Sequence, residues 1–345
     1  MTQVVLCGYY GYGNAGDEAL LATLLEQLPA HCTPIVLSGN PQATTALYGV
    51  AACDRYQWRQ VLRTLRRSQV FIWGGGSLIQ DVTSWRSPLY YLGLMTLAQH
   101  LGCRTVAWAQ GIGPVKSPVY RWWLRQLLRR CIAVTVRDSG SAALLRQWQI
   151  PHQQGADPVW LMRSPPPSEP SRTPTIAVSL RPHPTLTPER FATIAAALRA
   201  WQEDAGLEVL LLPFQPCQDL PLAEQLYGQL IASQTRLLCL ADPRQIKAVL
   251  AGVQGAIAMR LHALIMAASV GCPCFALSYD PKVSHLMADT GIPGWELSAL
   301  PATPHVLLSQ WQQHWHPNPP YLNYQAYRDS AQVHQAALEE LGDTF

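Results

Sequence analysis

The 345-residue sequence has few charged side chains and no long apolar run. Charged residues make up 14% of the chain and hydrophobic residues 48%, a balance that excludes an intrinsically disordered protein and indicates a globular one. The longest apolar run, which follows His262, covers about a dozen residues and is too short to cross a bilayer. The N-terminus lacks the basic stretch of a secretory leader. We therefore expect a cytoplasmic protein without a signal peptide.

The sequence also lacks metal-ligand motifs, and its number of cysteines is odd. The nine cysteines run from Cys7 to Cys274 and lie mostly in apolar stretches, which is typical of reduced, buried thiols in a cytosolic protein. Cys272 and Cys274 are separated by one residue rather than the two of zinc and redox motifs. We therefore expect no metal ion and no cofactor.

Positive charge is concentrated in the first half of the chain. Residues 1–165 contain 15 Lys and Arg against 7 Asp and Glu, whereas residues 166–345 contain 10 against 15. The first half therefore has the field of a protein that meets an anionic partner. Within residues 118–131, Arg121, Arg125 and Arg129 recur every four positions beside two tryptophans, as on a helix lying at a membrane surface. An ordinary solvated helix explains that pattern too.

Short apolar strands alternate with helical patterns through both halves. Runs such as Ser68–Trp73 and Arg104–Trp108 end in glycine or polar residues, which favours parallel sheets with a ligand site at their carboxyl edges. The length predicts two domains, and five prolines within residues 164–174 predict a stiff linker. We place the domains at residues 1–163 and 175–323, followed by a helix from 324 to 345 that returns to the first domain.

The sequence GYGNAG, from Gly11 to Gly16, lies between the first strand and the first helix and matches a weak dinucleotide fingerprint. Two features argue against NAD. The next strand ends at Ser38 without a carboxylate for a ribose diol, and Asp17 and Glu18 would repel a pyrophosphate at the helix N-terminus. An uncharged acceptor rich in hydroxyls fits this loop better.

We expect Tyr10 and Tyr12 to form stacking walls for such an acceptor, with Asn14 and Asp17 as hydrogen-bonding groups. The alternative for Asp17 is that it only caps the helix. Three successive glycines at 74–76 follow the strand that ends at Trp73, and we expect Gly75 and Gly76 to bring backbone close to the ligand.

Cations follow three apolar strands of the second half. Arg181 follows the run Thr175–Leu180, Arg260 and His262 follow Ala256–Ala258, and Lys282 follows Pro273–Leu277. Because parallel strands end at one edge of their sheet, these groups should converge there on a small phosphorylated acid. The alternative for Arg260 is an ion pair with a structural carboxylate.

Taken together, these motifs resemble those of the polysaccharide pyruvyl transferases, and most closely the branch that adds pyruvate ketals to cell-wall polysaccharide. The resemblance covers both halves in order and implies two doubly wound, Rossmann-like domains facing a cleft, as in glycosyltransferases of the B type. It rests on GYYGYGNAGDEALL at 8–21, WGGGSLIQD at 73–81, AQGIGP at 109–114, RDSGS at 137–141, GADP at 155–158, VSLR at 178–181, MRLHALIMA at 259–267 and YDPKV at 279–283.

The resemblance implies phosphoenolpyruvate as donor and an N-acetylmannosamine-type sugar, on a lipid-linked or polymeric glycan, as acceptor. The aromatic acceptor loop falls on Tyr10 and Tyr12, and Tyr12 stands where relatives often have phenylalanine. The donor-binding positions fall on Arg181, Arg260, Leu261, His262 and Lys282.

The chemistry needs a proton on the methylene carbon of phosphoenolpyruvate and two attacks by sugar hydroxyls at its C2. His262 is our candidate acid, since imidazole titrates near neutrality. Arg181 and Arg260 would grip the carboxylate and phosphate, Lys282 would act as a point charge, and Asp17 would deprotonate the acceptor.

Three other functions remain open: a sugar-nucleotide glycosyltransferase of the same fold, a non-catalytic sensor of phosphoenolpyruvate or sugar, and an NAD oxidoreductase. We expect no nucleic-acid partner, and a homo-oligomer is compatible with the sequence.

Overall fold

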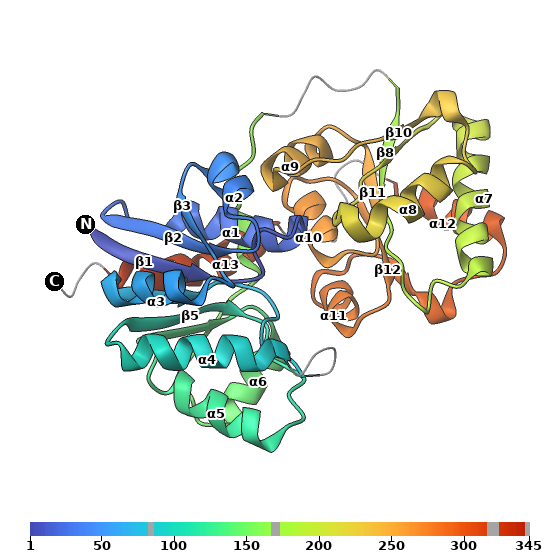
Figure 1. The fold of residues 1–345 in the computed structure, drawn as a ribbon. Coiled ribbons are helices and arrows are strands. Elements are labelled where there is room, and N and C mark those ends of the chain that lie inside the picture. The colour runs from blue at the N-terminus through green and yellow to red at the C-terminus, as the bar shows by residue number, and fades with distance from the viewer. Residues whose placement is uncertain (82–85, 167–172, 316–323, 342–345) are drawn as a thin grey trace. The chain divides into compact units, whose positions relative to one another are not determined.

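Two parallel sheets organise the chain, and each lies in its own unit (Figure 1). The computed structural model describes residues 1–81, 86–166, 173–315 and 324–341. The first unit comprises Met1–Tyr12, Asp17–Met162 and Gln325–Phe345, and the second comprises Gly13–Gly16 and Arg163–Tyr324. Part of the expected proline-rich linker, residues 167–172, lies outside the described residues.

The first sheet has seven parallel strands in the order β3-β2-β1-β4-β5-β6-β7. The order reverses direction at β1, which is the doubly wound topology expected from the alternating pattern. The strands are β1 (Thr2–Cys7), β2 (Cys32–Ser38), β3 (Ala51–Asp54), β4 (Val70–Trp73), β5 (Arg104–Gln110), β6 (Ala133–Val136) and β7 (Gln153–Gln154).

Helices cover both faces of this sheet. One core cluster joins Val61 of α3, Leu92 of α4, Leu124 of α5 and Leu145 of α6 to one face. A second core cluster, on the other face, contains Leu21 of α1 and Leu338 of α13. Tyr48 of α2 packs against this second cluster. The helices are α1 (Ala15–Gln27), α2 (Pro41–Tyr48), α3 (Trp58–Arg67), α4 (Arg86–His100), α5 (Pro118–Leu128), α6 (Ser139–Gln147) and α13 (Tyr324–Glu339), with a 3-10 turn, η1 (Pro158–Leu161).

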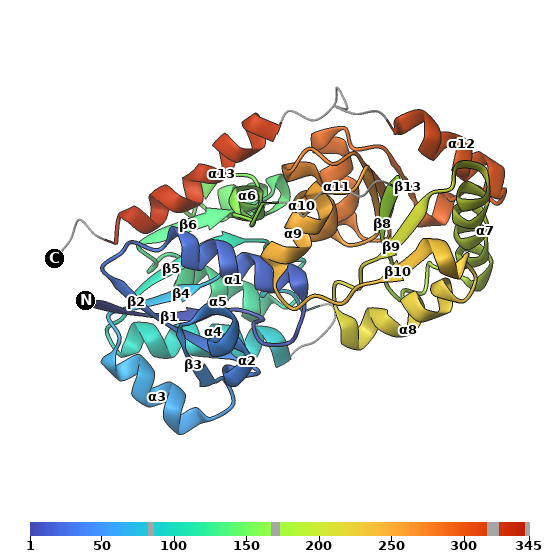
Figure 2. The ribbon, with the colours of Figure 1, turned by 90° about the horizontal axis from the view of Figure 1, so that it is seen from above.

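The second sheet has six parallel strands in the order β10-β9-β8-β11-β12-β13. The views in Figures 1 and 2 agree that α7, α8 and α12 lie on one side of it and α9, α10 and α11 on the other. The strands are β8 (Thr175–Ser179), β9 (Glu208–Leu211), β10 (Thr235–Leu237), β11 (Gly255–Ala258), β12 (Cys274–Ser278) and β13 (Gly294–Glu296). The helices are α7 (Pro188–Ala205), α8 (Pro216–Tyr227), α9 (Pro243–Ala251), α10 (Leu261–Ser269), α11 (Pro281–Thr290) and α12 (Pro304–His314), and the 3-10 turns are η2 (Ala232–Gln234) and η3 (Leu297–Ala299).

Local sequence explains where these elements begin and end. Strands β4, β8, β11 and β12 are buried along their whole lengths, as continuous apolar strands covered on both faces must be. Thr187 caps α7 by accepting from the Arg190 N–H, with Pro188 in the first turn. Gly206 ends the same helix with φ of 62°, a left-handed conformation that glycine adopts without strain.

Helix α13 packs on the first unit through a buried histidine. The Ala156 carbonyl lies 2.8 Å from His334 Nε2, and the Thr135 hydroxyl lies 2.8 Å from Nδ1. That hydroxyl also accepts the Ala109 N–H, so it donates to Nδ1, and Nε2 carries the imidazole proton. Burial lowers the pKa of His334 to about 4. The histidine is therefore neutral, and its ring ties the last helix to Thr135 of β6 and to the Ala156 carbonyl.

The arginine stripe predicted for residues 118–131 is only partly right. Arg121 and Arg129 are exposed, but Arg125 is half-buried with its guanidinium 6.0 Å from the Trp148 ring. The helix buries Leu124, Leu127 and Leu128 instead, so Arg125 falls at the edge of the packed face. None of the described helices combines the length and apolar character that crossing a membrane requires.

Candidate functional site

Three neighbouring strands of the second sheet carry the predicted cations at their carboxyl ends. Strand β11 pairs with β8 on one side and with β12 on the other. Arg181 lies two residues after β8, Arg260 two residues after β11, and Lys282 four residues after β12. The structure therefore brings these chain segments to one edge of one sheet.

Arg181 links all three strand ends. Its backbone N–H donates to Met259 Sδ at 3.4 Å, and its Nη1 donates to the Tyr279 hydroxyl at 2.8 Å. The guanidinium carbon lies 5.0 Å from the centre of the Tyr279 ring, a cation–π distance. Its Nε is buried and has no hydrogen-bond partner among the described residues. A buried guanidinium N–H of this kind suits an anionic ligand.

Arg260 is paired with a carboxylate, as in the alternative considered above. Its Nη2 donates to Asp219 Oδ1 at 2.6 Å and to Gln215 Oε1 at 3.3 Å, and its Nε donates to Asp219 Oδ2 at 3.1 Å. Asp219 is fully buried and Arg260 is 8% exposed. The edge formed by Nε and Nη2 is thus occupied.

His262 and Lys282 lie in the first turns of α10 and α11. Leu261 begins α10, and both Leu261 and His262 are half-buried. Lys282 is exposed, and its backbone N–H donates to the capping carboxylate of Asp280. Both side chains therefore start at helix N-termini, where backbone N–H groups favour an anion.

The residues Gly13–Gly16 belong to the same unit as these strands. The Ala15 N–H donates to the Phe214 carbonyl at 2.7 Å. A Cβ atom on Gly16 would fall 2.3 Å from His262 Nδ1, so only glycine fits there. Asn14 accepts the Gly16 N–H at 3.0 Å and caps α1, which makes its carbonyl oxygen a structural acceptor.

The interpretation of Tyr10 as a stacking wall was wrong. Its side chain is fully buried in the core of the first unit, between Gly8 and Gly74. A Cβ atom on Gly74 would lie 1.7 Å from its hydroxyl, and one on Gly75 would lie 2.8 Å from Leu20. These two glycines therefore make room for side chains of the core, which corrects the prediction that Gly75 approaches a ligand.

Gly76 differs from its two neighbours. It adopts φ of 128°, and its carbonyl accepts the Gly111 N–H at 2.8 Å. A Cβ atom there would stand 3.5 Å from Asp17 Oδ1. The structure thus brings together Asp17 and Gly76, two residues predicted to face the acceptor, at the carboxyl edge of the first sheet.

Tyr12 belongs to an aromatic platform that we define as Tyr9, Tyr12 and Tyr56. The Tyr9 and Tyr12 rings stack with centres 4.4 Å apart, and the Tyr12 and Tyr56 hydroxyls lie 2.6 Å apart. Tyr56 is 70% exposed and Tyr9 is 38% exposed. The buried Arg55 lies 5.6 Å from the Tyr12 ring and 5.8 Å from the Tyr56 ring, and donates to the Gly8 carbonyl. The buried Arg55 side chain therefore holds the Tyr12 and Tyr56 rings of the platform in place.

Glu18 holds the glycine loop from within the first unit. It accepts the Gly11 N–H at 2.7 Å and the Tyr48 hydroxyl at 3.0 Å. Burial raises its pKa, although both hydrogen bonds oppose the shift. The buried Glu18 side chain thus orders the loop from inside the first unit.

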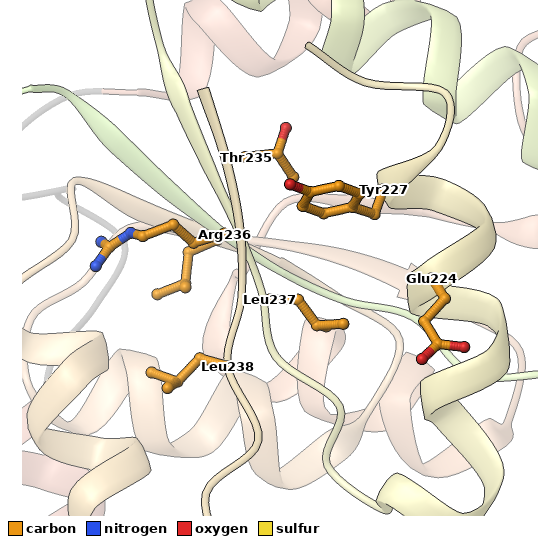
Figure 3. A pocket seen from close by; sticks show the side chains of 7 residues that line it. Glu224, Tyr227, Thr235, Arg236, Leu237 and Leu238 are labelled. Carbon is orange, nitrogen blue, oxygen red and sulfur yellow. The ribbon is translucent and has the colours of Figure 1, made fainter. Parts of the chain in front are cut away.

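A separate pocket of about 530 Å³ lies between α8 and strands β9 and β10. Figure 3 shows its Arg236 pointing away from Tyr227 and Glu224, and that arginine pairs with Glu208. Its lining contains three leucines and a single cation, Arg236, so it does not fit a small phosphorylated acid. Among the described residues there is no group of three His, Cys, Asp or Glu that could hold a metal ion.

Sequence reasoning missed Asp219, Tyr279, Tyr56 and Arg55. Asp219 lies 41 residues before its partner Arg260, and nothing in the spacing signals the pair. Tyr279 stood inside the YDPKV motif without a role. A polar residue just after a predicted strand was the available signal for Tyr279, since the cations were found in that way.

Comparison with known proteins gives one family match. A family model described as polysaccharide pyruvyl transferase matches residues 14–281. That span includes the donor-side positions Arg181, Arg260 and His262 and ends one residue before Lys282. No curated protein matches the chain significantly.

Solved structures with a similar fold include MnaA of S. aureus with UDP, with a TM-score of 0.66, 9% identity, and coverage of 99% of this chain and 95% of that one. HepE of Anabaena in complex with UDP-glucose has a TM-score of 0.60 and 10% identity, and the match covers 100% of both chains. UDP-GlcNAc 2-epimerase of Neisseria meningitidis, bound to UDP-GlcNAc, has a TM-score of 0.62 and 9% identity. The match covers 99% of this chain and 100% of that one. At such low identity these likenesses establish the fold alone, which is two Rossmann-like α/β domains like those of the B-type glycosyltransferases.

Proposed function

The chain belongs to the polysaccharide pyruvyl transferase family, and on that premise we propose that it moves the pyruvyl group of phosphoenolpyruvate onto two hydroxyls of a cell-wall sugar. The product is a pyruvate ketal, and phosphate is released. One observation carries the proposal: Arg181, Arg260 with His262, and Lys282 follow three adjacent strands of one parallel sheet. A small dianion or trianion is the ligand class that such an edge favours.

On the donor side, Arg181 is the principal binding group. Tyr279 holds its Nη1, so the guanidinium is oriented before the donor arrives. Lys282 adds a point charge for the phosphate. Arg260 contributes from a position fixed by Asp219, which reduces its net charge and leaves Arg181 the larger share of carboxylate binding.

His262 supplies the proton that starts the reaction. The proton adds to the methylene carbon of phosphoenolpyruvate, and C2 becomes an oxocarbenium centre. One sugar hydroxyl adds to C2 and loses its proton. A second hydroxyl then adds to C2 and loses its proton while the C2–O bond to phosphate breaks. One phosphate is released for each ketal formed, without a redox step.

The acceptor side rests on the aromatic platform and Asp17. Pyranose rings stack on tyrosine faces, and Tyr56, which is largely exposed and joined to Tyr12 through their hydroxyls, offers such a face. Asp17, beside Gly76, is the proposed base for the first hydroxyl. We propose an N-acetylmannosamine-type sugar on a lipid-linked or polymeric glycan, modified in the cytoplasm.

A sugar-nucleotide glycosyltransferase is the second candidate, because UDP or a UDP-sugar is bound in the three related structures described above. Titration with UDP separates the two functions. Saturable binding of UDP, with no effect of phosphoenolpyruvate, would favour the second candidate.

The direct test is phosphate release from phosphoenolpyruvate in the presence of a panel of N-acetylhexosamine acceptors, with mass spectrometry of the sugar. We expect phosphate and pyruvylated sugar in equal amounts. His262→Gln should abolish both, whereas His285→Gln, an exposed position on α11, should leave both unchanged. Phosphate release without a modified sugar, or no release with any acceptor, would contradict the proposal.

A further inference from the structure

One face of the first unit is strongly basic. Between Trp58 and Ile132 the sequence contains a single acidic residue, Asp81, and its carboxylate accepts the backbone N–H groups of Lys116 and Ser117. Eight side chains of the α3 and α5 segments are basic and exposed: Arg59, Arg63, Arg66, Arg67, Lys116, Arg121, Arg129 and Arg130. We name these residues, with Trp58, Val119 and Trp122, the basic face.

The two helices that carry the basic face lie on the same side of the first sheet. Val61 of α3 and Leu124 of α5 pack into one core cluster, together with residues of α4, and Figure 1 shows α3, α4 and α5 on one side of that sheet. Each helix follows a parallel strand and leads into the next, so both run against the strands. Their first turns therefore lie toward the carboxyl edge of the sheet.

Large apolar side chains are exposed in the first two turns of both helices. Trp58, the first residue of α3, is 55% exposed, and Val119 and Trp122 of α5 are 67% and 63% exposed. Tryptophan side chains beside arginines are the combination that anchors proteins at the boundary between lipid headgroups and acyl chains.

We propose that the basic face binds the surface of an anionic lipid bilayer. These eight exposed cations complement a negative surface, because the single acidic residue in their stretch of sequence, Asp81, binds backbone N–H groups. The exposed valine and tryptophans favour lipid over nucleic acid, because they can insert among acyl chains but gain little from a polyphosphate backbone. This interaction is independent of the reaction proposed above.

The proposal differs from the helix contact expected for residues 118–131 alone. Half of the exposed cations lie on or at the end of α3, and Arg125, the middle of the expected stripe, packs against Trp148. Both helices should therefore contribute, and α3 should contribute at least as much as α5.

The test is sedimentation with vesicles of phosphatidylcholine containing 30% phosphatidylglycerol, by design about one charged lipid in three, and with pure phosphatidylcholine as reference. We expect binding to the anionic vesicles that weakens with added salt. Neutralising Arg59, Arg63, Arg66 and Arg67 to glutamine should lower the partition coefficient about 100-fold, and Trp58→Ser about 10-fold.

The control variant neutralises two exposed arginines of the second unit, Arg199 and Arg236, which pair with glutamates. This variant should bind the vesicles as the parent protein does. All variants must keep the parental circular dichroism and melting temperature. The proposal is overturned if the α3 variant sediments like the parent, if pure phosphatidylcholine binds equally well, or if Trp58→Ser retains full vesicle binding while duplex RNA competes the vesicles away.

Discussion

The Asp219 carboxylate holds the Arg260 guanidinium through hydrogen bonds of 2.6 Å to Nη2 and 3.1 Å to Nε. Because Asp219 is fully buried, Asp219→Ala would leave an uncompensated charge in the interior. We expect a loss of about 3–5 kcal/mol in the free energy of unfolding, measured by urea denaturation. Glu203→Gln, which breaks the exposed pair with Arg199, should cost less than about 1 kcal/mol. Equal losses would show that burial does not matter here.

Tyr279→Phe tests how Arg181 is oriented. The ring remains under the guanidinium, but the hydroxyl that accepts from Nη1 is lost. We expect the KM for phosphoenolpyruvate to rise about tenfold, the equivalent of one hydrogen bond to a charged group, with little change in stability. Tyr227→Phe, in the same unit, should leave KM unchanged. A rise in KM for the acceptor instead would remove Tyr279 from the donor side.

Gly16→Ala would push a methyl group against the His262 imidazole, since the added Cβ would stand 2.3 Å from Nδ1. We expect kcat to fall about 100-fold, because a displaced proton donor no longer reaches the substrate. Gly228→Ala is the matched control: its φ of −66° suits alanine and its nearest neighbour is 3.6 Å away. Steady-state kinetics of both variants would measure the two kcat values. A normal kcat for Gly16→Ala would show that His262 is not the proton donor.

Tyr56→Ala removes the most exposed ring of the aromatic platform. If the platform binds the acceptor sugar, its KM should rise about tenfold, the value of one aromatic stacking contact, while the KM for phosphoenolpyruvate stays constant. Tyr56→Phe, which keeps the ring and loses the hydrogen bond to Tyr12, should have a smaller effect. An acceptor KM that is unchanged in Tyr56→Ala would place the sugar elsewhere.

His334 predicts a stability that depends on pH. Its pKa is about 4 in the folded chain against an ordinary 6.5, so the unfolded state binds the proton first as pH falls. This residue should therefore remove stability between pH 6.5 and 4, by about 3 kcal/mol in total. Chemical denaturation at several pH values should show a shallower decline for His334→Gln than for the parent. Parallel curves would contradict a neutral buried imidazole.

The sheets were predictable because their strands are continuous apolar runs. Strands such as β8 and β12 could be located because each is a short apolar run followed by polar residues. The short strands β3, β7, β10 and β13 were not identified, because two to four residues at a sheet edge carry no distinct pattern.

The sequence predicted those residues of the candidate site that directly follow an apolar strand. Arg181, Arg260 and Lys282 were found because each follows an apolar run. The pair between Arg260 and Asp219, and the burial of Tyr10 beneath Gly74, depend on contacts between distant or crowded segments. A glycine that admits a ligand and one that admits a neighbouring tyrosine look identical in sequence.

The return of α13 to the first unit affects how the chain acquires its structure. The second unit lies between two segments of the first, so its residues are all synthesised before α13 is. During translation the second unit can fold as soon as it leaves the ribosome, whereas the first still lacks the helix that covers Trp108. The part of the protein that is made first is therefore the last to be finished.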